Sequence, residues 1–396
     1  MTNDVQGRAL RVLIVSQSAS EFGVRKICEA LSLHSGVRVR ALGPRRGYYP
    51  LGGRVVETPR SSHGAYDLVN GRVYRAMADF SNPYLTGLLR EVLRFRPDVI
   101  QVFNEAYSGV HAQAVLYRNL FRPGALCFST GAQNVIPRRV KSKREQFKRR
   151  FAHRHVDGVA CWSTGAKQAL IEAGFPSPRL AVTHWGVPLE AFFPARNDAR
   201  REAMGAARDF VLGYVGRIEL QKGLWTLLLA MRRLPSSVKC LCIGDGRWGG
   251  SFDAKLHEFG LADRVIRVPT VPGEAVPSYL NAMDALVLPS ESTTSLVEQF
   301  GRVLPEAMAC EVPVIGSDSG AIPEVIGDAG MVFVERDFVQ LADCVQRLAA
   351  DAELRRKLGR AGRERAAALF SCEAFAQRLL ALYRRTPSRR ERGRLG

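Results

Sequence analysis

Short apolar runs that alternate with helix-like segments restrict the fold of this chain more than any other feature. An apolar run of four to eight residues between turn residues is typical of a buried strand, and helix-like segments separate many of the runs. The runs that we interpret as strands are residues 11–16, 37–42, 98–103, 125–130, 157–163, 179–187, 210–216, 238–244, 265–269, 285–290, 312–317 and 331–334. Strands alternating with helices need crossover connections, so the pattern predicts parallel sheets covered by helices on both faces.

The length of the chain predicts two domains. A chain of 396 residues is too long for one hydrophobic core, and a polar, proline-bearing stretch at 192–209 separates two series of strands. We therefore expect an α/β fold with Rossmann-like, doubly wound domains at 1–195 and 196–370. Residues 371–396 should form a helix that packs back toward the N-terminal domain, then an Arg-rich tail. Two facing sheets would leave a cleft at the carboxyl ends of their strands, where such sheets bind ligands.

Composition and cysteine usage narrow the class of protein. With 46% hydrophobic and 8% aromatic residues, the chain is typical of a soluble globular protein. No run approaches the roughly 20 apolar residues that span a bilayer, and the N-terminus lacks the pattern of a signal peptide, so we expect a cytoplasmic protein. The eight cysteines show no metal-ligand spacing, which favours reduced, buried thiols and no metal site.

Glu298 and Glu306 flank the strongest candidate for a functional site. Seven residues separate the two acids, and a glycine and the start of a predicted helix lie between them. Backbone donors at a helix start lack intrahelical partners and carry the positive end of the helix dipole, which suits an anion such as a diphosphate. Glu298 would then contact hydroxyls of a sugar, and Glu306 would reach a ribose diol. The four predicted donors are the N–H groups of Gly301, Arg302, Val303 and Leu304.

The segment GYVGRIELQKG (213–223) predicts a second part of the same site. Its strand ends at Gly216, and Arg217 and Lys222 follow in a turn that leads to a helix. A guanidinium can fork to two phosphate oxygens, while a lysine supplies a compact charge. The pair could neutralise a diphosphate. The alternative is two solvated loop cations.

These segments resemble the signature of the family 4 retaining glycosyltransferases of the GT-B fold, also described as glycosyl transferases group 1. Glu298 and Glu306 match the Glu-x7-Glu pair of that family, and Arg217 and Lys222 resemble its phosphate-binding pair. The segments 276–290 and 319–327 strengthen the resemblance. It covers most of residues 210–330 with specific motifs and the first half only by its pattern.

The resemblance implies a retaining, metal-independent hexosyltransferase. Its donor would be a nucleotide-diphosphate sugar, UDP- or GDP-linked, with no further cofactor, and its acceptor a glycan or a lipid-linked hydroxyl in polysaccharide or glycolipid biosynthesis. Glu298, Arg217 and Lys222 would be catalytic. The first domain would lie on the acceptor side. The implied donor-binding residues are Gly216, Arg217, Lys222, Glu298, Gly301, Arg302, Val303, Leu304 and Glu306.

The first half departs from the family pattern near its reaction centre. Many members carry a histidine after the strand that ends here in Thr130, whereas this chain has Gln133 and Asn134 in that neighbourhood. We therefore assign no histidine as a general base. In retaining members the departing phosphate can itself take the proton of the acceptor.

The run GDGRWG (244–249) formally matches the dinucleotide fingerprint GxGxxG. That fingerprint also wants an acidic residue at the end of the next strand, whereas Asp263 precedes the strand. A structural turn is the simpler interpretation.

Positive charge is concentrated in the first half of the chain. Residues 1–195 hold 28 Lys and Arg against 13 Asp and Glu, whereas the remainder holds 29 against 25. The densest run, RRVKSKREQFKRR (138–150), favours a solvated helix face or docking to anionic lipid at the inner face of the cell membrane. With Phe147 as its only aromatic residue, it gives little support to nucleic-acid binding, and we predict none.

Two other functional classes stay open on the sequence alone. One is a GT-B enzyme with different chemistry, such as a sugar-nucleotide epimerase or a phosphorylase. The other is a non-catalytic basic protein that binds membranes or nucleic acid.

Overall fold

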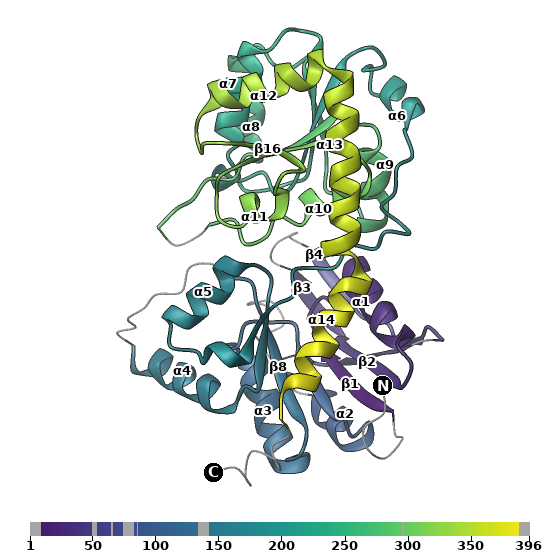
Figure 1. The fold of residues 1–396 in the computed structure, drawn as a ribbon, viewed down its shortest axis with the longest axis vertical. Helices are drawn as coiled ribbons and strands as arrows, with labels where there is room; N and C mark the ends of the chain where they lie inside the picture. Colours follow the sequence, from purple (N-terminus) through teal and green to yellow (C-terminus); the bar gives the residue numbers. More distant parts are fainter. Residues whose placement is uncertain are drawn as a thin grey trace. The chain divides into compact units, whose positions relative to one another are not determined.

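The computed structural model describes residues 9–49, 54–64, 66–73, 83–84, 86–133, 142–294 and 297–387. Asn134, the first part of the basic run at 138–141 and most of the Arg-rich tail lie outside these ranges. Two compact units divide the chain (Figure 1). Unit 1 comprises Met1–Gly186 with Cys372–Gly396, and unit 2 comprises Val187–Ser371.

Unit 1 is built on an eight-stranded sheet with the order β10-β9-β8-β7-β1-β2-β6-β5. All pairs are parallel except β5 with β6, as the apolar runs predict. The strands are β1 (Leu10–Val15), β2 (Val37–Pro44), β5 (Ser61–Ser62), β6 (Tyr66–Gly71), β7 (Val99–Val102), β8 (Leu126–Gly131), β9 (Gly158–Cys161) and β10 (Leu180–Val182), with a separate hairpin of β3 (Arg46–Tyr49) and β4 (Arg54–Glu57). The sequence patterns did not predict β3 to β6: β3, β4 and β5 have at most 4 residues, and β6 mixes apolar and polar residues.

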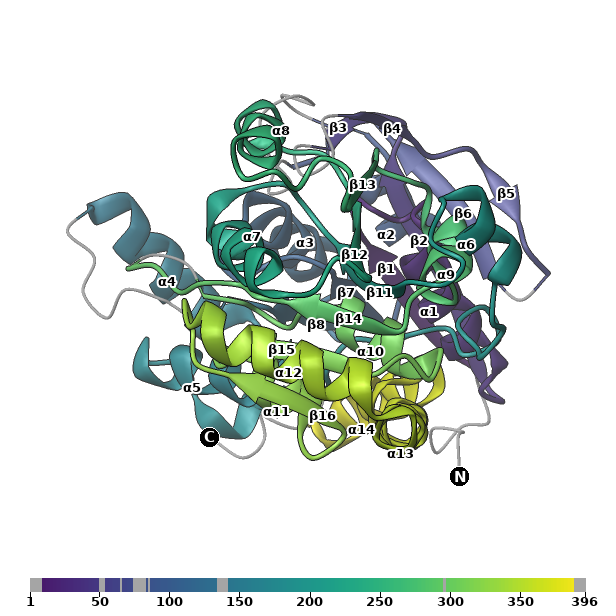
Figure 2. The same cartoon turned by 90° about the horizontal axis from the view of Figure 1, so that it is seen from above.

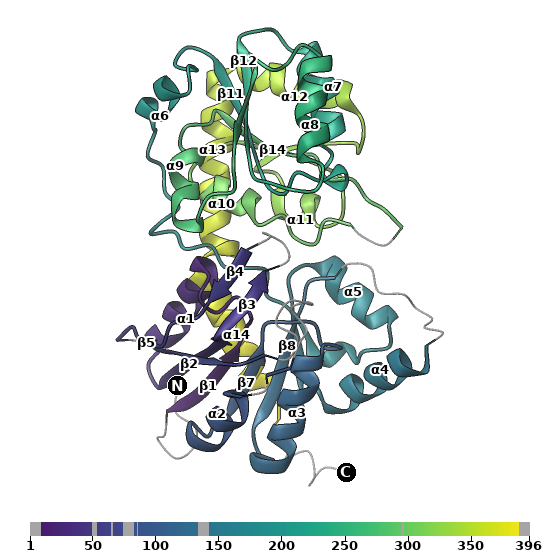
Figure 3. The same ribbon diagram turned by 180° about the vertical axis from the view of Figure 1, so that it is seen from behind.

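Helices cover both faces of this sheet. The bounds are α1 (Phe22–Leu33), α2 (Leu88–Arg94), α3 (Gly109–Phe121), α4 (Lys143–His155), α5 (Thr164–Glu172), η1 (Ser177–Arg179) and α14 (Cys372–Arg385). α14 packs beside α1, while α2 packs beside α3 (Figure 3). α14 is held to unit 1 by hydrogen bonds from Arg378 to the Thr183 carbonyl (3.2 Å) and from the Tyr383 hydroxyl to Gln101 (3.0 Å).

Unit 2 is an all-parallel, six-stranded sheet with the order β13-β12-β11-β14-β15-β16 (Figure 2). Its strands are β11 (Phe210–Val215), β12 (Val238–Ile243), β13 (Val265–Val268), β14 (Ala285–Leu288), β15 (Val314–Ser317) and β16 (Gly330–Phe333). Its helices are α6 (Asp198–Ala203), η2 (Leu220–Lys222), α7 (Leu224–Arg233), α8 (Gly249–Glu258), η3 (Gly273–Ala275), α9 (Val276–Leu280), α10 (Val303–Ala309), α11 (Ile322–Ile326), α12 (Phe338–Ala350), α13 (Ala352–Arg365) and the π-helical turn η4 (Ala366–Phe370).

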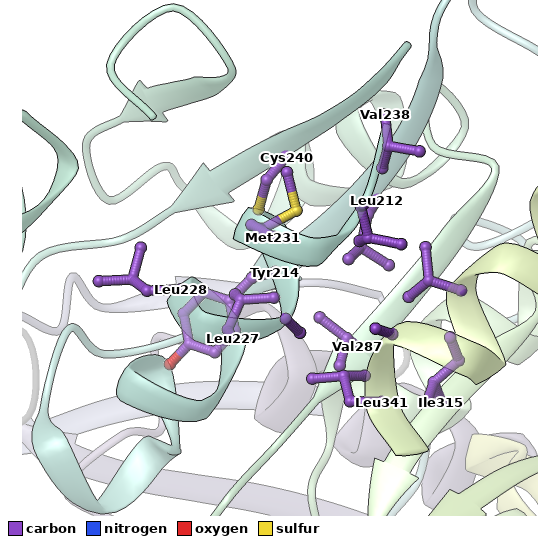
Figure 4. Packing of buried hydrophobic residues seen from close by; sticks show 14 of the residues in the cluster. Leu212, Tyr214, Leu227, Leu228, Met231, Val238, Cys240, Val287, Ile315 and Leu341 are labelled. Atoms are coloured by element: carbon purple, nitrogen blue, oxygen red, sulfur yellow. The ribbon is translucent and has the colours of Figure 1, made fainter. Parts of the chain in front are cut away.

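The core of unit 2 lies between the sheet and the helices α7, α8 and α12 on one of its faces. Leu212 and Tyr214 of β11 and Val287 of β14 pack against Leu227 of α7 and Leu341 of α12 in this core (Figure 4). On the opposite face, α10 packs beside α13. The carboxyl ends of the strands in this packed sheet carry the loops of the candidate site.

The division between the units differs from the predicted domain boundary. Unit 2 begins at Val187, whereas the sequence suggested 196. The segment in between is bound to unit 2, because Arg363 donates to the Phe192 carbonyl (2.7 Å) and the Ala195 N–H donates to Asn281 (2.7 Å). The polar composition of 192–209 therefore marks a surface segment of unit 2 rather than a linker.

Candidate functional site

The candidate site lies where the winding of the unit 2 sheet reverses. β11 leads to β12 and β13 on one side, and β14 stands on its other side, so the loops after β11 and β14 leave neighbouring strands in opposite directions. Open α/β sheets bind ligands at such a switch point, outside the carboxyl ends of the strands. Both predicted site segments, 216–222 and 298–306, follow these two strands.

An ion pair joins the two loops. Lys222 Nζ lies 2.6 Å from Glu298 Oε2, and the Ser290 hydroxyl donates to the same oxygen over 2.6 Å. The side chains of Glu298 and Lys222 are only 9% and 18% exposed. Burial by itself would raise the pKa of Glu298, but the charge of Lys222 and the hydrogen bonds from Lys222, Ser290 and the Gln299 N–H outweigh it and hold the pKa below its ordinary value. Glu298 is therefore an ionised, buried acceptor.

Arg217 is held in the loop after β11 by a residue that sequence reasoning missed. Its Nη1 lies 2.9 Å from Glu219 Oε1, and Gln221 donates to the other oxygen of Glu219. The Tyr214 hydroxyl donates to the Arg217 carbonyl over 2.7 Å and fixes the backbone. The charges of Glu298 and Arg217 both act on the Tyr214 phenol, whose pKa is raised mainly by burial. The guanidinium remains about one-third exposed and accessible to a ligand.

Glycines allow three loop backbones to approach at this edge. A Cβ on Gly244 would stand 2.0 Å from the Gly216 carbonyl oxygen, and one on Gly246 would stand 2.2 Å from that of Ile218. Gly223 is left-handed (φ 67°), and a Cβ there would meet the Pro289 carbonyl oxygen at 1.6 Å. The run GDGRWG thus has a structural role, because its glycines pack against the loop that carries Arg217.

The loop after β15 holds the backbone of Glu298 in place. The Ala321 N–H donates to the Glu298 carbonyl over 3.0 Å. Gly320 is left-handed (φ 55°), and a Cβ on it would stand 2.2 Å from the same carbonyl oxygen. The Ser319 hydroxyl accepts a long hydrogen bond of 3.5 Å from the Glu298 N–H. The segment 319–327 therefore positions the acid, which its sequence alone did not reveal.

The start of α10 offers fewer donors than the sequence predicted. The helix begins at Val303, and the Leu304 N–H donates to the Gly301 carbonyl over 2.8 Å, so the prediction that Leu304 donates to an anion is wrong. A tight turn at Gly301 (φ 74°) places that carbonyl over the first turn of the helix. Within the described ranges, no residue accepts from the N–H groups of Gly301 or Val303. Arg302 precedes the helix with an exposed side chain.

Glu306 lies in the first turn of α10 and is partly buried. Burial raises the pKa of Glu306 to about 7, although the charge of Arg302 opposes this shift. Within the described part of the chain, no residue donates a hydrogen bond to its carboxyl group. Pro305, which would break a helix interior, is tolerated here because the third helical position needs no intrahelical N–H bond. The carboxyl of Glu306 can therefore accept from, or donate to, a ligand hydroxyl.

No group of three or more His, Cys, Asp and Glu side chains among the described residues is arranged to hold a metal ion. All eight cysteines are buried free thiols. None of the helices that the structure describes is long and apolar enough to cross a membrane.

Parts of this chain are similar in sequence to known glycosyltransferases. Residues 196–365 match the family model of the glycosyl transferases group 1. The sulfoquinovosyl transferase SQD2 of Arabidopsis thaliana is 29% identical over 292 residues, which cover 70% of this chain and 54% of that protein. A D-inositol 3-phosphate glycosyltransferase of Mycolicibacterium smegmatis is 33% identical over 53% of this chain and 48% of its own length. The chain thus spans about half the length of these curated relatives.

Solved structures establish the fold class. Sucrose-phosphate synthase from Thermosynechococcus elongatus superposes with a TM-score of 0.72 at 22% identity, covering 95% of this chain and 98% of its own. HepE of Anabaena, solved with UDP and glucose, has a TM-score of 0.69 at 17% identity over 94% and 98% of the two chains. The fold is GT-B. The similarity to the glycosyl transferases group 1 rests on residues 196–365 and on the relatives above.

Proposed function

We propose that this chain is a retaining glycosyltransferase that moves a sugar from a nucleotide-diphosphate sugar to a hydroxyl acceptor without a catalytic metal. The observation that carries the proposal is the contact between Lys222 and Glu298 at the switch point of unit 2. It brings a cation and an ionised acid from two distant segments to one sheet edge. The group 1 family match of residues 196–365 supports the same reaction class.

Each group has a distinct part in the proposed reaction. Arg217 and Lys222 neutralise the charge that develops on the leaving diphosphate. The N–H groups at the start of α10 assist them, and Gly216 lets the backbone after β11 approach the diphosphate. Glu298 accepts from a hydroxyl of the transferred sugar, and Glu306 binds the ribose diol. UDP is the first nucleotide to test, because HepE was solved with UDP and UDP-glucose.

The bond changes balance without a side-chain base. The bond between the sugar C1 and the β-phosphate oxygen breaks, and its electron pair stays on that oxygen. The acceptor oxygen forms a new bond to C1 on the same face, and its proton passes to the departing phosphate. Retention of configuration follows from attack on the face that the phosphate leaves.

The proposal extends to the acceptor and its location. Unit 1 would hold a glycan or lipid-linked acceptor in cell-surface polysaccharide or glycolipid biosynthesis. A relative supports this pathway by its name: the capsular polysaccharide biosynthesis glycosyltransferase CapM of Staphylococcus aureus is 32% identical over about half of each chain. The protein would act in the cytoplasm, peripherally at the inner membrane face.

Exposed side chains on α3 and α4 support membrane contact. Leu116, Leu120 and Phe121 of α3 are exposed, as is Phe147 of α4 (69%). The exposed residues Lys143, Arg150 and Arg154 lie on the same face of α4 as Phe147, at helical spacing. On α4, an apolar side chain beside basic ones suits an anionic bilayer, which pairs headgroup charge with an apolar layer. We call these seven residues the α3–α4 surface.

Isothermal titration with UDP, GDP and ADP, followed by product analysis with the matching sugars, tests the function. We expect micromolar binding of one nucleotide and an α-linked product from an α-linked donor. Donor conversion in the absence of acceptor would instead indicate an epimerase, and no nucleotide binding would indicate a non-catalytic protein. A requirement for Mg²⁺, tested with EDTA, would overturn metal independence alone.

A further inference from the structure

Glu105 lies at the equivalent position of unit 1, where its sheet reverses. β1 leads to β2 on one side and stands beside β7 on the other, so β7 ends at the switch point. Glu105 follows β7 by three residues. Sequence reasoning did not select it, because the first half carries no specific motif. The fold places it where an open α/β sheet takes its ligand.

The backbone of the neighbouring loop holds one oxygen of Glu105. The N–H groups of Ala132 and Gln133, which follow β8, donate to Oε1 over 2.9 and 3.3 Å. Asn104 fixes the backbone of Glu105, because its side-chain oxygen accepts from the Glu105 N–H over 2.8 Å. The carboxyl group is thus fixed across the carboxyl ends of two adjacent strands. Among the described residues, none donates to the second oxygen, Oε2.

The electrostatic setting of Glu105 differs from that of Glu298. Glu298 has a lysine partner, whereas no cation within the described ranges forms an ion pair with Glu105. Burial raises the pKa of Glu105 to about 7, and the two backbone hydrogen bonds only partly offset it. The titratable groups that face it are Tyr107 of its own loop and Cys161 of β9, both with a pKa raised to about 12 mainly by burial. Arg149 of α4 and Lys167 of α5 face these two groups in turn.

We propose that Glu105 is the hydroxyl-binding residue of unit 1, and that its Oε2 takes a hydrogen bond from a sugar or polyol acceptor. This inference rests on the proposed function, because it assigns the acceptor side of that reaction. A fixed carboxyl group with one oxygen that accepts no hydrogen bond from the described residues is suited to a hydroxyl, which can donate to it. A phosphate or carboxylate ligand would be repelled.

The test uses the full chain and methyl α-D-glucopyranoside as the hydroxyl probe. Saturation-transfer NMR should show that the wild type binds the probe, and that Glu105→Gln weakens binding at least about fivefold. The glutamine can still accept from Ala132 and Gln133 through its amide oxygen, so the loop should keep its structure. Glu29→Gln on α1, a carboxyl group paired with Lys26 (2.8 Å), is the matched control and should bind normally.

A pH series separates hydroxyl binding from a purely structural role. An ionised carboxylate accepts a stronger hydrogen bond than a neutral acid, so probe binding by the wild type should strengthen as the pH rises through about 7. Glu105→Gln should abolish this dependence. Equal probe binding by Glu105→Gln and the wild type, or no binding of the probe by the wild type, would overturn the inference.

Nucleotide binding distinguishes a failure of the Glu105 assignment from a failure of the proposed function. UDP should bind the wild type and both variants alike, because the donor residues belong to unit 2. Loss of UDP binding in Glu105→Gln alone, with a lowered melting temperature, would show a structural role and overturn the assignment. If the wild type itself ignores every nucleotide, the proposed function fails instead.

Discussion

Lys222 and Glu298 are 76 positions apart in the sequence, yet Nζ and Oε2 lie 2.6 Å apart. The lysine is the last residue of η2 and the acid precedes α10, so the contact depends on β11 lying beside β14. Without a ligand, the lysine neutralises a buried carboxylate. In the proposed reaction, the bound diphosphate would share the same charge.

Substitution of Lys222 should separate stability from activity. Lys222→Met leaves the Glu298 carboxylate buried without its counter-charge, which should cost about 3 kcal/mol of unfolding free energy. Sugar transfer should fall by at least two orders of magnitude, because a donor to the leaving group is lost. Urea unfolding and initial rates measure the two effects.

The double variant Lys222→Met/Glu298→Gln is the matched control for that experiment. Removing both charges should restore most of the stability, because the amide can still accept from Ser290, but transfer should stay low. Recovery of activity in the double variant would contradict a role for Lys222 in the reaction.

Arg217 should depend on Glu219 for its position. Arg217→Ala should weaken UDP binding about tenfold or more, and Glu219→Gln should weaken it less, because the guanidinium loses its ionic anchor but keeps its charge. Isothermal titration measures both affinities. Arg208→Ala, at an exposed position of unit 2, is the control and should bind UDP normally. Wild-type affinity in Arg217→Ala would remove this residue from the site.

Gly244 and Gly249 of the run GDGRWG should differ sharply in how well they tolerate substitution by alanine. Gly244→Ala forces a Cβ to within 2.0 Å of the Gly216 carbonyl oxygen at a φ of 132°, so the loop of Arg217 must move. Backbone strain of this kind costs on the order of 1–3 kcal/mol, and UDP binding should fall with it. Gly249→Ala meets nothing within 4 Å and should behave as the wild type. Thermal unfolding and UDP titration check the pair, and equal behaviour would refute the close approach.

Glu306 should make stability fall with rising pH. Burial raises its pKa in the folded chain to about 7, above the ordinary value of 4.5. The stabilising contribution of the neutral acid is complete below about pH 4.5 and is lost as the pH rises through 7. The melting temperature of Glu306→Gln, relative to the wild type, should therefore increase between pH 5 and pH 8. A difference that does not change with pH would show that Glu306 is ionised normally.

The α3–α4 surface should bind anionic vesicles. Phe147→Ser and Arg150→Glu should each reduce sedimentation with vesicles that contain phosphatidylglycerol, through loss of apolar contact and of charge. Lys255→Glu on α8 of unit 2 changes charge equally and should have no effect. Unchanged sedimentation of both α3–α4 variants would exclude this surface, and indifference of the wild type to anionic lipid would exclude the membrane proposal.

The sequence by itself determined most of the strand and helix order, the parallel sheets and the residue types of the candidate site. These follow from local patterns, because burial on both faces demands continuous apolar runs, and sharp loops demand glycine. The apolar runs predicted most of the strands of both sheets. The strands β3 to β6 were not predicted, because polar residues interrupt them and their pairing depends on the neighbouring strands.

Only the tertiary structure decided which residues meet. Lys222 and Glu298 join the loops after β11 and β14 of unit 2, and the N–H groups of Ala132 and Gln133 join the loop after β8 to Glu105 after β7 in unit 1. Glu219 anchors Arg217 within the single loop after β11. The loss of the Leu304 donor depends on the turn at Gly301, whose left-handed backbone brings a carbonyl over the helix start. Such contacts depend on strand order, a long-range property that spacing along the chain does not encode.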